Sequence, residues 1–96
     1  MGQETTLSDV ISRLTHFDGD LTIYASVPWT AISRAIVIQE PEPGSDLQEP
    51  ASLGLKYFLE VFIARDFLDG WRSSLGREPS AEETLARVIY YAENDA

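Results

Sequence analysis

The sequence predicts an α+β fold, a single small domain in which a helix, a β-hairpin and two further helices follow one another. Three observations predict it. Apolar residues recur at three- and four-residue spacing near both ends of the chain, two short runs of strand-forming residues lie between them, and 96 residues suffice for one core. We therefore expect residues 1–96 to form one domain, with a small antiparallel sheet packed on helices.

The first expected element is a helix over "TTLSDVISRLTHF", residues 5–17. Its apolar residues share one helical face: Leu7, Val10, Ile11, Leu14 and Phe17. Thr6 and Asp9 resemble a capping box, with Asp in place of the usual Glu. Asp18 and Gly19 then predict a turn that ends the helix.

Two strands are expected next, "LTIYA" at residues 21–25 and "RAIVIQ" at residues 34–39. Between them, "SVPWT" predicts a loop, because Pro28 has no N–H to donate to a strand ladder. The unbroken apolar run from Ala35 to Ile38 indicates a strand with both faces covered. An antiparallel hairpin is the simplest pairing of the two strands.

Residues 53–75 are predicted to form one long helix. Its stripe alternates spacings of four and three: Tyr57, Val61, Ala64, Leu68, Trp71 and Leu75. A competing interpretation makes "YFLEVFI" a third strand, because it is rich in aromatic and β-branched residues. We favour the helix, because the stripe continues through Trp71. On this interpretation the aromatic side chains of the segment lie in the core: Tyr57, Phe58, Phe62, Phe67 and Trp71.

The last helix is expected in "REPSAEETLARVIYYAENDA". Ser80 and Glu83 form a capping box at its start, and Gly76 suits the end of the preceding helix. Its core face follows the helical spacing: Ala81, Leu85, Val88, Ile89 and Ala92. Tyr90 falls nearly opposite that face.

Composition excludes several classes of function. The chain has no cysteine, which rules out disulfides, thiolate nucleophiles and cysteine-bound metals. It has no apolar run of roughly 18 residues and no secretory pattern at its start, so we expect a cytoplasmic protein without membrane contact. The formal net charge is −9. That charge repels phosphate backbones, so direct nucleic-acid binding is not expected.

Candidate catalytic and metal-binding residues are few. His16 is the sole histidine, and the helical phase places it on the outer face. The carboxylates Asp18 and Asp20 belong to a predicted turn. No phosphate-binding glycine loop and no nucleophile motif is present. We therefore expect no catalytic residue, no metal site and no cofactor, so the protein is predicted not to be an enzyme.

The densest negative charge lies in an acidic, proline-rich loop, residues 40–52, which contains "EPEPGSDLQEP". Its four carboxylates are predicted to meet a basic protein partner: Glu40, Glu42, Asp46 and Glu49. Their spacing lacks the alternating ligands of a calcium loop. Trp29 is the fifth candidate, as an anchor at an interface. The alternative places Trp29 under the hairpin as a hydrophobic plug.

The segments "GLKYFLEVFIARDFLDGW" and "IYYAENDA" resemble a family of small acidic bacterial proteins with no assigned activity. The matching positions are Gly54, Leu55, Tyr57 to Val61, Trp71, and Ile89 to Ala96. In size and acidity the chain also resembles immunity proteins of contact-dependent and polymorphic toxin systems. That resemblance implies a cytoplasmic protein that neutralises a cognate toxin, a basic nuclease, by stoichiometric, charge-complementary contact. Two alternatives stay open: a self-associating structural or regulatory module, hence a homo-oligomer, and an acidic mimic of nucleic acid.

Overall fold

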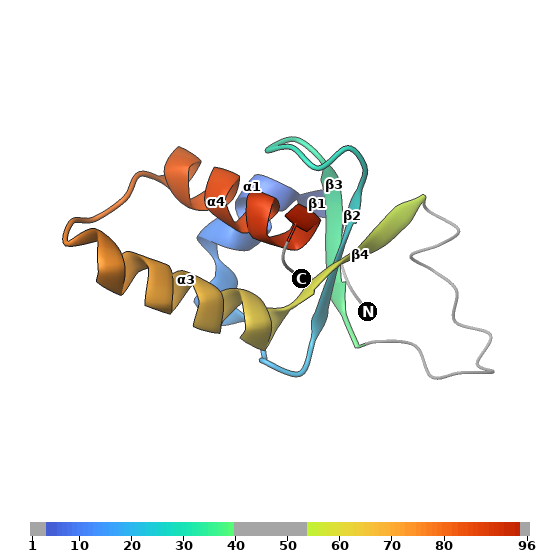
Figure 1. Ribbon diagram of the computed structural model, residues 1–96. Helices are drawn as coiled ribbons and strands as arrows, with labels where there is room; N and C mark the ends of the chain where they lie inside the picture. Colours follow the sequence, from blue (N-terminus) through green and yellow to red (C-terminus); the bar gives the residue numbers. More distant parts are fainter. Residues whose placement is uncertain (1–3, 40–53, 95–96) are drawn as a thin grey trace.

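The architecture is the predicted α+β fold, one antiparallel sheet with helices along one face (Figure 1). The structure is a computed structural model that describes residues 4–39 and 54–94. Its elements are β1 (Thr5–Thr6), α1 (Leu7–Ser12), the 3-10 helix η1 (Leu14–His16), β2 (Thr22–Ser26), β3 (Arg34–Ile38), β4 (Leu55–Glu60), α3 (Val61–Leu75) and α4 (Ala81–Asn94). In this part of the chain, no helix is long and apolar enough to cross a membrane.

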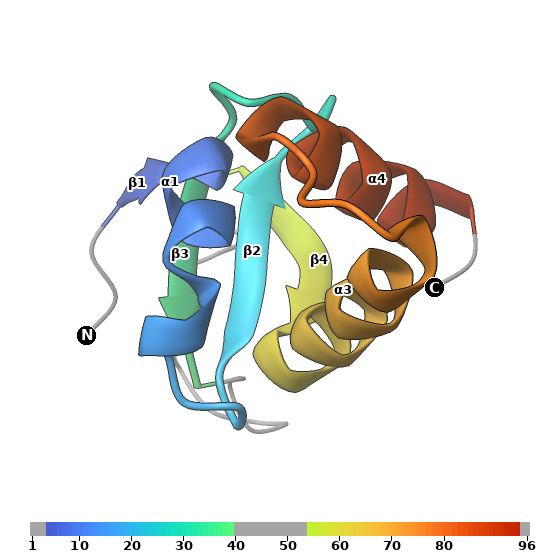
Figure 2. The ribbon, with the colours of Figure 1, turned by 90° about the vertical axis from the view of Figure 1, so that its left-hand side faces the viewer.

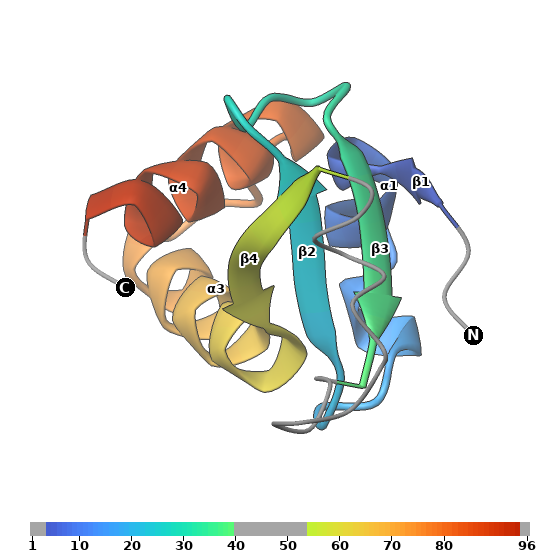
Figure 3. The ribbon, with the colours of Figure 1, turned by 90° about the vertical axis from the view of Figure 1, so that its right-hand side faces the viewer.

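Within the described residues, the sheet has the strand order β1-β3-β2-β4, and each neighbouring pair is antiparallel. The predicted hairpin is formed by β2 and β3, whose register pairs Thr22 with Ile38 and Ala25 with Ala35. Figure 2 shows α1, α3 and α4 in front of the sheet. Figure 3 shows the opposite face, with β3, β2 and β4 towards the viewer.

The hydrophobic core lies between the sheet and the helices. Its buried members come from α1, η1, the inward faces of the strands, α3 and α4: Leu7, Val10, Ile11, Leu14, Ile23, Ala25, Ala35, Phe58, Leu59, Val61, Ala64, Leu68, Leu85 and Val88. Burial of such surface stabilises a fold by about 25 cal/mol per Å². The predicted core face of the first helix is confirmed, with Phe17 half-buried. That of the last helix is confirmed except for Ala81, which is exposed at the first residue of α4.

A second, smaller cluster of buried residues occupies the other face of the sheet. It contains Tyr24, Ile36 and Leu55, with Ile38 packed against it. Successive side chains of a strand point to opposite faces, so Ile36 belongs to this cluster and Ala35 to the main core. The prediction that both faces of β3 are covered is confirmed for these two residues, which are both buried.

The prediction of one long helix over residues 53–75 is wrong for its first part. Leu55–Glu60 form the strand β4, and α3 begins at Val61. Pairing with β2 gives the backbone groups of β4 their hydrogen-bond partners. Aromatic and β-branched side chains also suit a half-buried strand. The competing strand interpretation of "YFLEVFI" is therefore right up to Glu60 and wrong for the last three residues, which are helical.

An irregularity in β4 changes which side chains are buried. Tyr24 pairs with Tyr57 and Ile23 with Leu59, so Phe58 is an extra residue between two pairs. Such a bulge shifts the alternation of side chains by one position. As a result, the consecutive residues Phe58 and Leu59 are both buried in the main core.

The aromatic side chains expected in the core divide into two groups. Phe58 is buried, and Phe67 and Trp71 pack half-buried against the core. Tyr57 and Phe62 are 44% and 47% exposed, contrary to the prediction. The reason is the change from strand to helix between them. Tyr57 follows the alternation of β4 to the outer sheet face, and Phe62 lies on the outer side of the first turn of α3.

The N-terminal helix is shorter than the predicted span 5–17. It ends at Ser12 and is followed by η1, and the short strand β1 precedes it. The Asp9 N–H donates to Thr6 Oγ1 at 3.1 Å, as in a capping box. The Asp9 carboxylate, however, accepts from Arg13. The bond from the Asp9 N–H to the Thr6 side chain is therefore present, as predicted. The Asp9 carboxylate forms an ion pair with Arg13 instead of accepting from the backbone of Thr6.

The C-terminal helix follows the prediction closely. Glu83 N–H donates to Ser80 Oγ at 3.1 Å, and Ser80 N–H donates to Glu83 Oε1 at 3.0 Å, which completes the capping box. Gly76 ends α3 with φ of 71°, a left-handed conformation that favours glycine. Tyr90 is 56% exposed, as its place opposite the core face predicts.

Candidate functional site

The turn between η1 and β2 packs on the start of α3. The carbonyl oxygens of Gly19 and Leu21 accept the N–H groups of Phe62, at 3.3 Å, and Val61, at 2.9 Å. The first N–H groups of a helix need acceptors from outside the helix. The residue before α3 supplies no side-chain bond, so the turn caps α3 with its backbone. The turn and the helix are thereby held in one arrangement.

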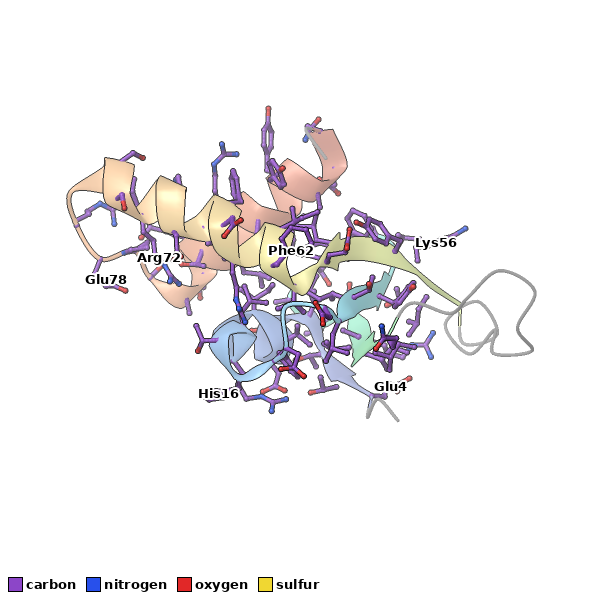
Figure 4. The ribbon with its side chains drawn as sticks, turned by 90° about the horizontal axis from the view of Figure 1, so that it is seen from below. Glu4, His16, Lys56, Phe62, Arg72 and Glu78 are labelled. Carbon is purple, nitrogen blue, oxygen red and sulfur yellow. The ribbon has the colours of Figure 1, made fainter. Side chains whose placement is uncertain are left out.

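Gly19 lies in contact with the first turns of α3. A Cβ atom on residue 19 would lie 3.4 Å from Phe62 Cβ and 3.7 Å from Arg65 Nη2. Arg65 donates from Nη1 to the Phe17 carbonyl oxygen at 2.7 Å, which ties α3 to the other side of the turn. The half-exposed side chain of Phe62 lies beside the turn, at the start of α3 (Figure 4).

Carboxylates flank this junction. Two belong to the turn and one precedes α3, and together with the aromatic ring they form what we call the acidic end: Asp18, Asp20, Glu60 and Phe62. Within residues 4–39 and 54–94, none of the three carboxylates is in an ion pair. Other carboxylates of the same part of the chain are paired with arginines, namely Asp9, Glu4 and Glu83. The three carboxylates of the acidic end therefore have no ion-pair partner among these residues, and the one cation at the junction, Arg65, donates to the Phe17 carbonyl oxygen instead.

The sheet register places the acidic end beside the last residue of β3. Thr22, the first residue of β2, pairs with both Glu60 and Ile38. Ile38 is the last residue of β3, and the segment 40–52 begins two residues later in the sequence. The predicted partner-binding residues of that segment lie outside the described residues: Glu40, Glu42, Asp46 and Glu49. The chain therefore enters its most acidic segment from the acidic end.

The opposite end of the sheet has a different charge. Lys56 lies near the start of β4, opposite Ala25 near the end of β2. Arg34, the first residue of β3, forms an ion pair with Glu4 at 3.6 Å. The connection between β2 and β3, residues 27–33, carries no charged side chain. Negative charge is thus concentrated at one end of the sheet.

Trp29 packs on the core from the connection between β2 and β3. Its Nε1 donates to the Ala25 carbonyl oxygen at 3.2 Å. Its ring meets the ring of Phe58 edge to face, with centroids 4.8 Å apart and an interplanar angle of 86°. Only part of the side chain is exposed. This position corresponds to the plug that the sequence offered as an alternative, and contact of Trp29 with a partner stays a prediction.

The candidates for catalysis and metal binding are not brought together. His16 is exposed on η1, as expected. Across the described ranges, no group of three or more His, Asp or Glu side chains is placed to hold a metal ion. Asp18 and Asp20 are exposed side chains of one turn. What the acidic end can do chemically is attract and contact a cationic surface.

Two neighbouring hollows lie where α1, α3 and α4 meet. Each has a volume of about 260 Å³, and they share Ile11, Ser12 and Arg72. Their rims carry both signs of charge, with Asp69 in one and Glu78 in the other. The first hollow is lined by Arg65, Arg72 and Asp69, and the second by Arg72 and Glu78, so neither presents charge of a single sign.

The sequence did not predict that the residues of the acidic end lie together. Phe62 was expected in the core, and Asp18 and Asp20 were expected only in a turn. Their proximity to Glu60 depends on a backbone contact between segments far apart in the chain. No local pattern in the sequence signals that contact.

Comparison with known proteins assigns no function, because the chain matches no protein-family model, no curated protein and no solved structure. The resemblance of "YFLEV" and "IYYAENDA" to a family of acidic bacterial proteins therefore stays a prediction.

Proposed function

We propose that this protein is an immunity-type protein of the cytoplasm, which binds a basic toxin domain and neutralises it by stoichiometric contact. The observation that carries the proposal is the acidic end. There, Asp18, Asp20 and Glu60 lack ion-pair partners among the described residues, and the backbone bonds between the turn and α3 bring their segments to the start of α3, where Phe62 is half-exposed. The proposed partner is a nuclease, whose basic cleft for nucleic acid complements this surface.

The two kinds of group have separate roles in the proposed contact. Carboxylates attract a basic partner over a distance of about one Debye length and raise the association rate. An aromatic ring that becomes buried slows dissociation, because contacts of this type supply much of the binding free energy at interfaces. Neither role requires a catalytic residue.

Self-association has weaker support. Tyr90 is exposed on α4, and the Arg87 guanidinium lies 5.4 Å from its ring and 5.1 Å from the ring of Phe67. Aromatic and arginine side chains of this kind are enriched at interfaces. However, a net charge of −9 on each copy opposes contact between two copies. An acidic mimic of nucleic acid would use the same carboxylates as the leading proposal and differ in its partner.

Affinity capture from an extract of the native host tests the proposal. The immobilised proteins are the wild type, the triple variant Asp18→Asn, Asp20→Asn, Glu60→Gln, and a control triple variant Asp69→Asn, Glu78→Gln, Glu82→Gln. Both variants lose the same charge, but the control positions lie elsewhere on α3, α4 and their connection. We expect a basic protein, identified by mass spectrometry, to be retained by the wild type and the control and lost by the first variant.

Equal retention by all three proteins would contradict the acidic end as the binding surface. A second measurement then separates the candidate functions. Inhibition of the purified partner's nuclease activity at a one-to-one ratio supports neutralisation, whereas a nucleic-acid-binding partner without toxicity indicates the mimic. A stable homo-oligomer with no retained partner indicates self-association.

A further inference from the structure

The connection between β2 and β3 exposes aliphatic side chains at the end of the sheet opposite the acidic end. Ile32 is 83% exposed and Val27 is 54% exposed. Residues 27–33, "VPWTAIS", contain no charged side chain. Single exposed apolar residues are common on protein surfaces and by themselves indicate nothing. What distinguishes Ile32 is how firmly its backbone is held.

Hydrogen bonds hold the backbone on both sides of Ile32. The Ala31 carbonyl oxygen accepts from the N–H of Ser8 at 3.1 Å, and the Ser33 carbonyl oxygen accepts from the N–H of Leu7 at 2.8 Å. These are the first N–H groups of α1, which need acceptors outside the helix. The connection therefore caps α1 from two points that bracket Ile32.

The connection is also braced from within. The buried side chain of Ser33 accepts the Thr30 N–H at 2.8 Å and donates to the Pro28 carbonyl oxygen at 3.1 Å. The Ser33 N–H donates to the Thr30 carbonyl oxygen at 3.1 Å, and Trp29 packs on Phe58. Turning Ile32 inwards would break several of these bonds, so its side chain is held in the solvent.

We propose that Ile32, assisted by Val27, is a preorganised aliphatic anchor that enters an apolar pocket of the basic protein partner. This inference rests on the proposed function. An anchor whose backbone is already ordered loses less conformational entropy on binding, so more of the free energy of burying its side chain contributes to affinity. Such anchors act mainly on the dissociation rate.

Area and charge favour this occupant over others. Two side chains expose far less than the roughly 800 Å² that each partner buries in a stable interface. A contact between two copies through this connection alone would therefore be too small. A membrane surface is disfavoured, because anionic lipids repel a chain of net charge −9.

One partner can contact both ends of the sheet. β2 has five residues, Thr22–Ser26. At about 3.4 Å per residue, the connection and the acidic end are separated by about 17 Å. An interface of roughly 800 Å² per partner is about 30 Å across, so it spans that separation.

The test uses the protein captured from the native-host extract, purified and bound in turn to the wild type, Ile32→Ser, Ile32→Val and Ala31→Ser. Ile32→Val keeps a smaller aliphatic side chain, and Ala31→Ser places a hydroxyl at the exposed neighbouring position. We expect Ile32→Ser to dissociate about tenfold to a hundredfold faster than the wild type. The two control variants should stay within a few-fold of the wild type, and all four association rates should share one salt dependence.

Each other outcome overturns the inference or separates it from the proposed function. Equal dissociation rates for the four proteins overturn the anchor while leaving the acidic end intact. If Ile32→Ser alone has an effect and the acidic triple variant has none, the anchor stands and the proposed electrostatic function fails. An extract in which the wild type retains no partner overturns both. A wild-type dimer that Ile32→Ser converts to a monomer, measured by sedimentation velocity, makes a second copy the occupant and also overturns the inference.

Discussion

The N–H of Phe62 donates to the carbonyl oxygen of Gly19 at 3.3 Å, and this bond joins the turn before β2 to the first turn of α3. It brings the carboxylates of Asp18 and Asp20 to the junction that Glu60 precedes. The acidic end is therefore a consequence of how α3 is capped, and its stability and its charge can be tested separately.

Replacement of Gly19 by valine should destabilise the protein. A Cβ at residue 19 would lie 3.4 Å from Phe62 Cβ, at van der Waals contact, so we expect the two further methyl groups of valine to crowd Phe62 and Arg65. Overpacking of this kind costs about 1–3 kcal/mol in the free energy of unfolding. Urea denaturation measures the change.

The matched control is Gly70→Ala within α3. No atom lies within 4 Å of a Cβ placed there, and alanine is the better helix former. We expect a gain of about 0.5–1 kcal/mol in the free energy of unfolding. If both substitutions destabilise equally, the turn does not pack on α3 as described.

Phe58→Ala should be among the most damaging substitutions in the chain. The ring is buried in the main core and meets Trp29 edge to face. Removing a buried phenylalanine costs about 3–5 kcal/mol. A double-mutant cycle with Trp29→Ala should show a coupling of about 0.5–1.5 kcal/mol between the rings, measured by thermal unfolding. Additive losses would place Trp29 away from the core and restore it as a free interface residue.

Glu83 should make the stability of the protein depend on pH under acidic conditions. Hydrogen bonds from Arg77, and then from the Ser80 N–H, lower the pKa of Glu83 from its ordinary 4.5 to about 2. A carboxyl with a lowered pKa in the folded state stabilises the fold above its unfolded pKa. That contribution is present above pH 4.5 and is lost as the pH falls from about 4.5 to about 2.

The comparison variant is Glu83→Gln, which can still accept the Ser80 N–H but does not titrate. Between pH 4.5 and about 2, the free energy of unfolding should fall more steeply for the wild type than for this variant. The pKa of Asp9 is also lowered, chiefly by its hydrogen bonds from Arg13, but both proteins share that effect. If the free energy of unfolding falls equally steeply with pH for both proteins, Arg77 does not lower the pKa of Glu83 in solution.

Local sequence signals predicted the last helix and the hairpin well. The side chains of Ser80 and Glu83 each accept the backbone N–H of the other, so the start of the last helix can be recognised from four consecutive residues. The change from strand to helix at Val61 was missed, because the apolar stripe from Tyr57 runs on at helical spacing through Trp71. Pairing of β4 with β2, a contact between distant segments, overrides that stripe.

The candidate site was only partly predictable for the same reason. Net charge indicated a basic partner, but the positions of Phe62 and Asp20 depend on the capping of α3 by a distant turn. The exposure of Ile32 depends on bonds between its neighbours and the start of α1. These bonds join distant segments, so the sequence around Ile32 does not reveal whether its side chain is exposed or buried.

The most direct test of the central claim is the rate of association between this protein and its captured basic partner, measured by stopped flow from about 0.05 M to about 0.5 M NaCl. For the wild type and the Asp69→Asn, Glu78→Gln, Glu82→Gln control, we predict fast association that slows as salt rises. For the Asp18→Asn, Asp20→Asn, Glu60→Gln variant, we predict association at least tenfold slower in low salt, with a weaker salt dependence. If the two triple variants associate at the same rate with the same salt dependence, the acidic end does not guide this protein to its partner.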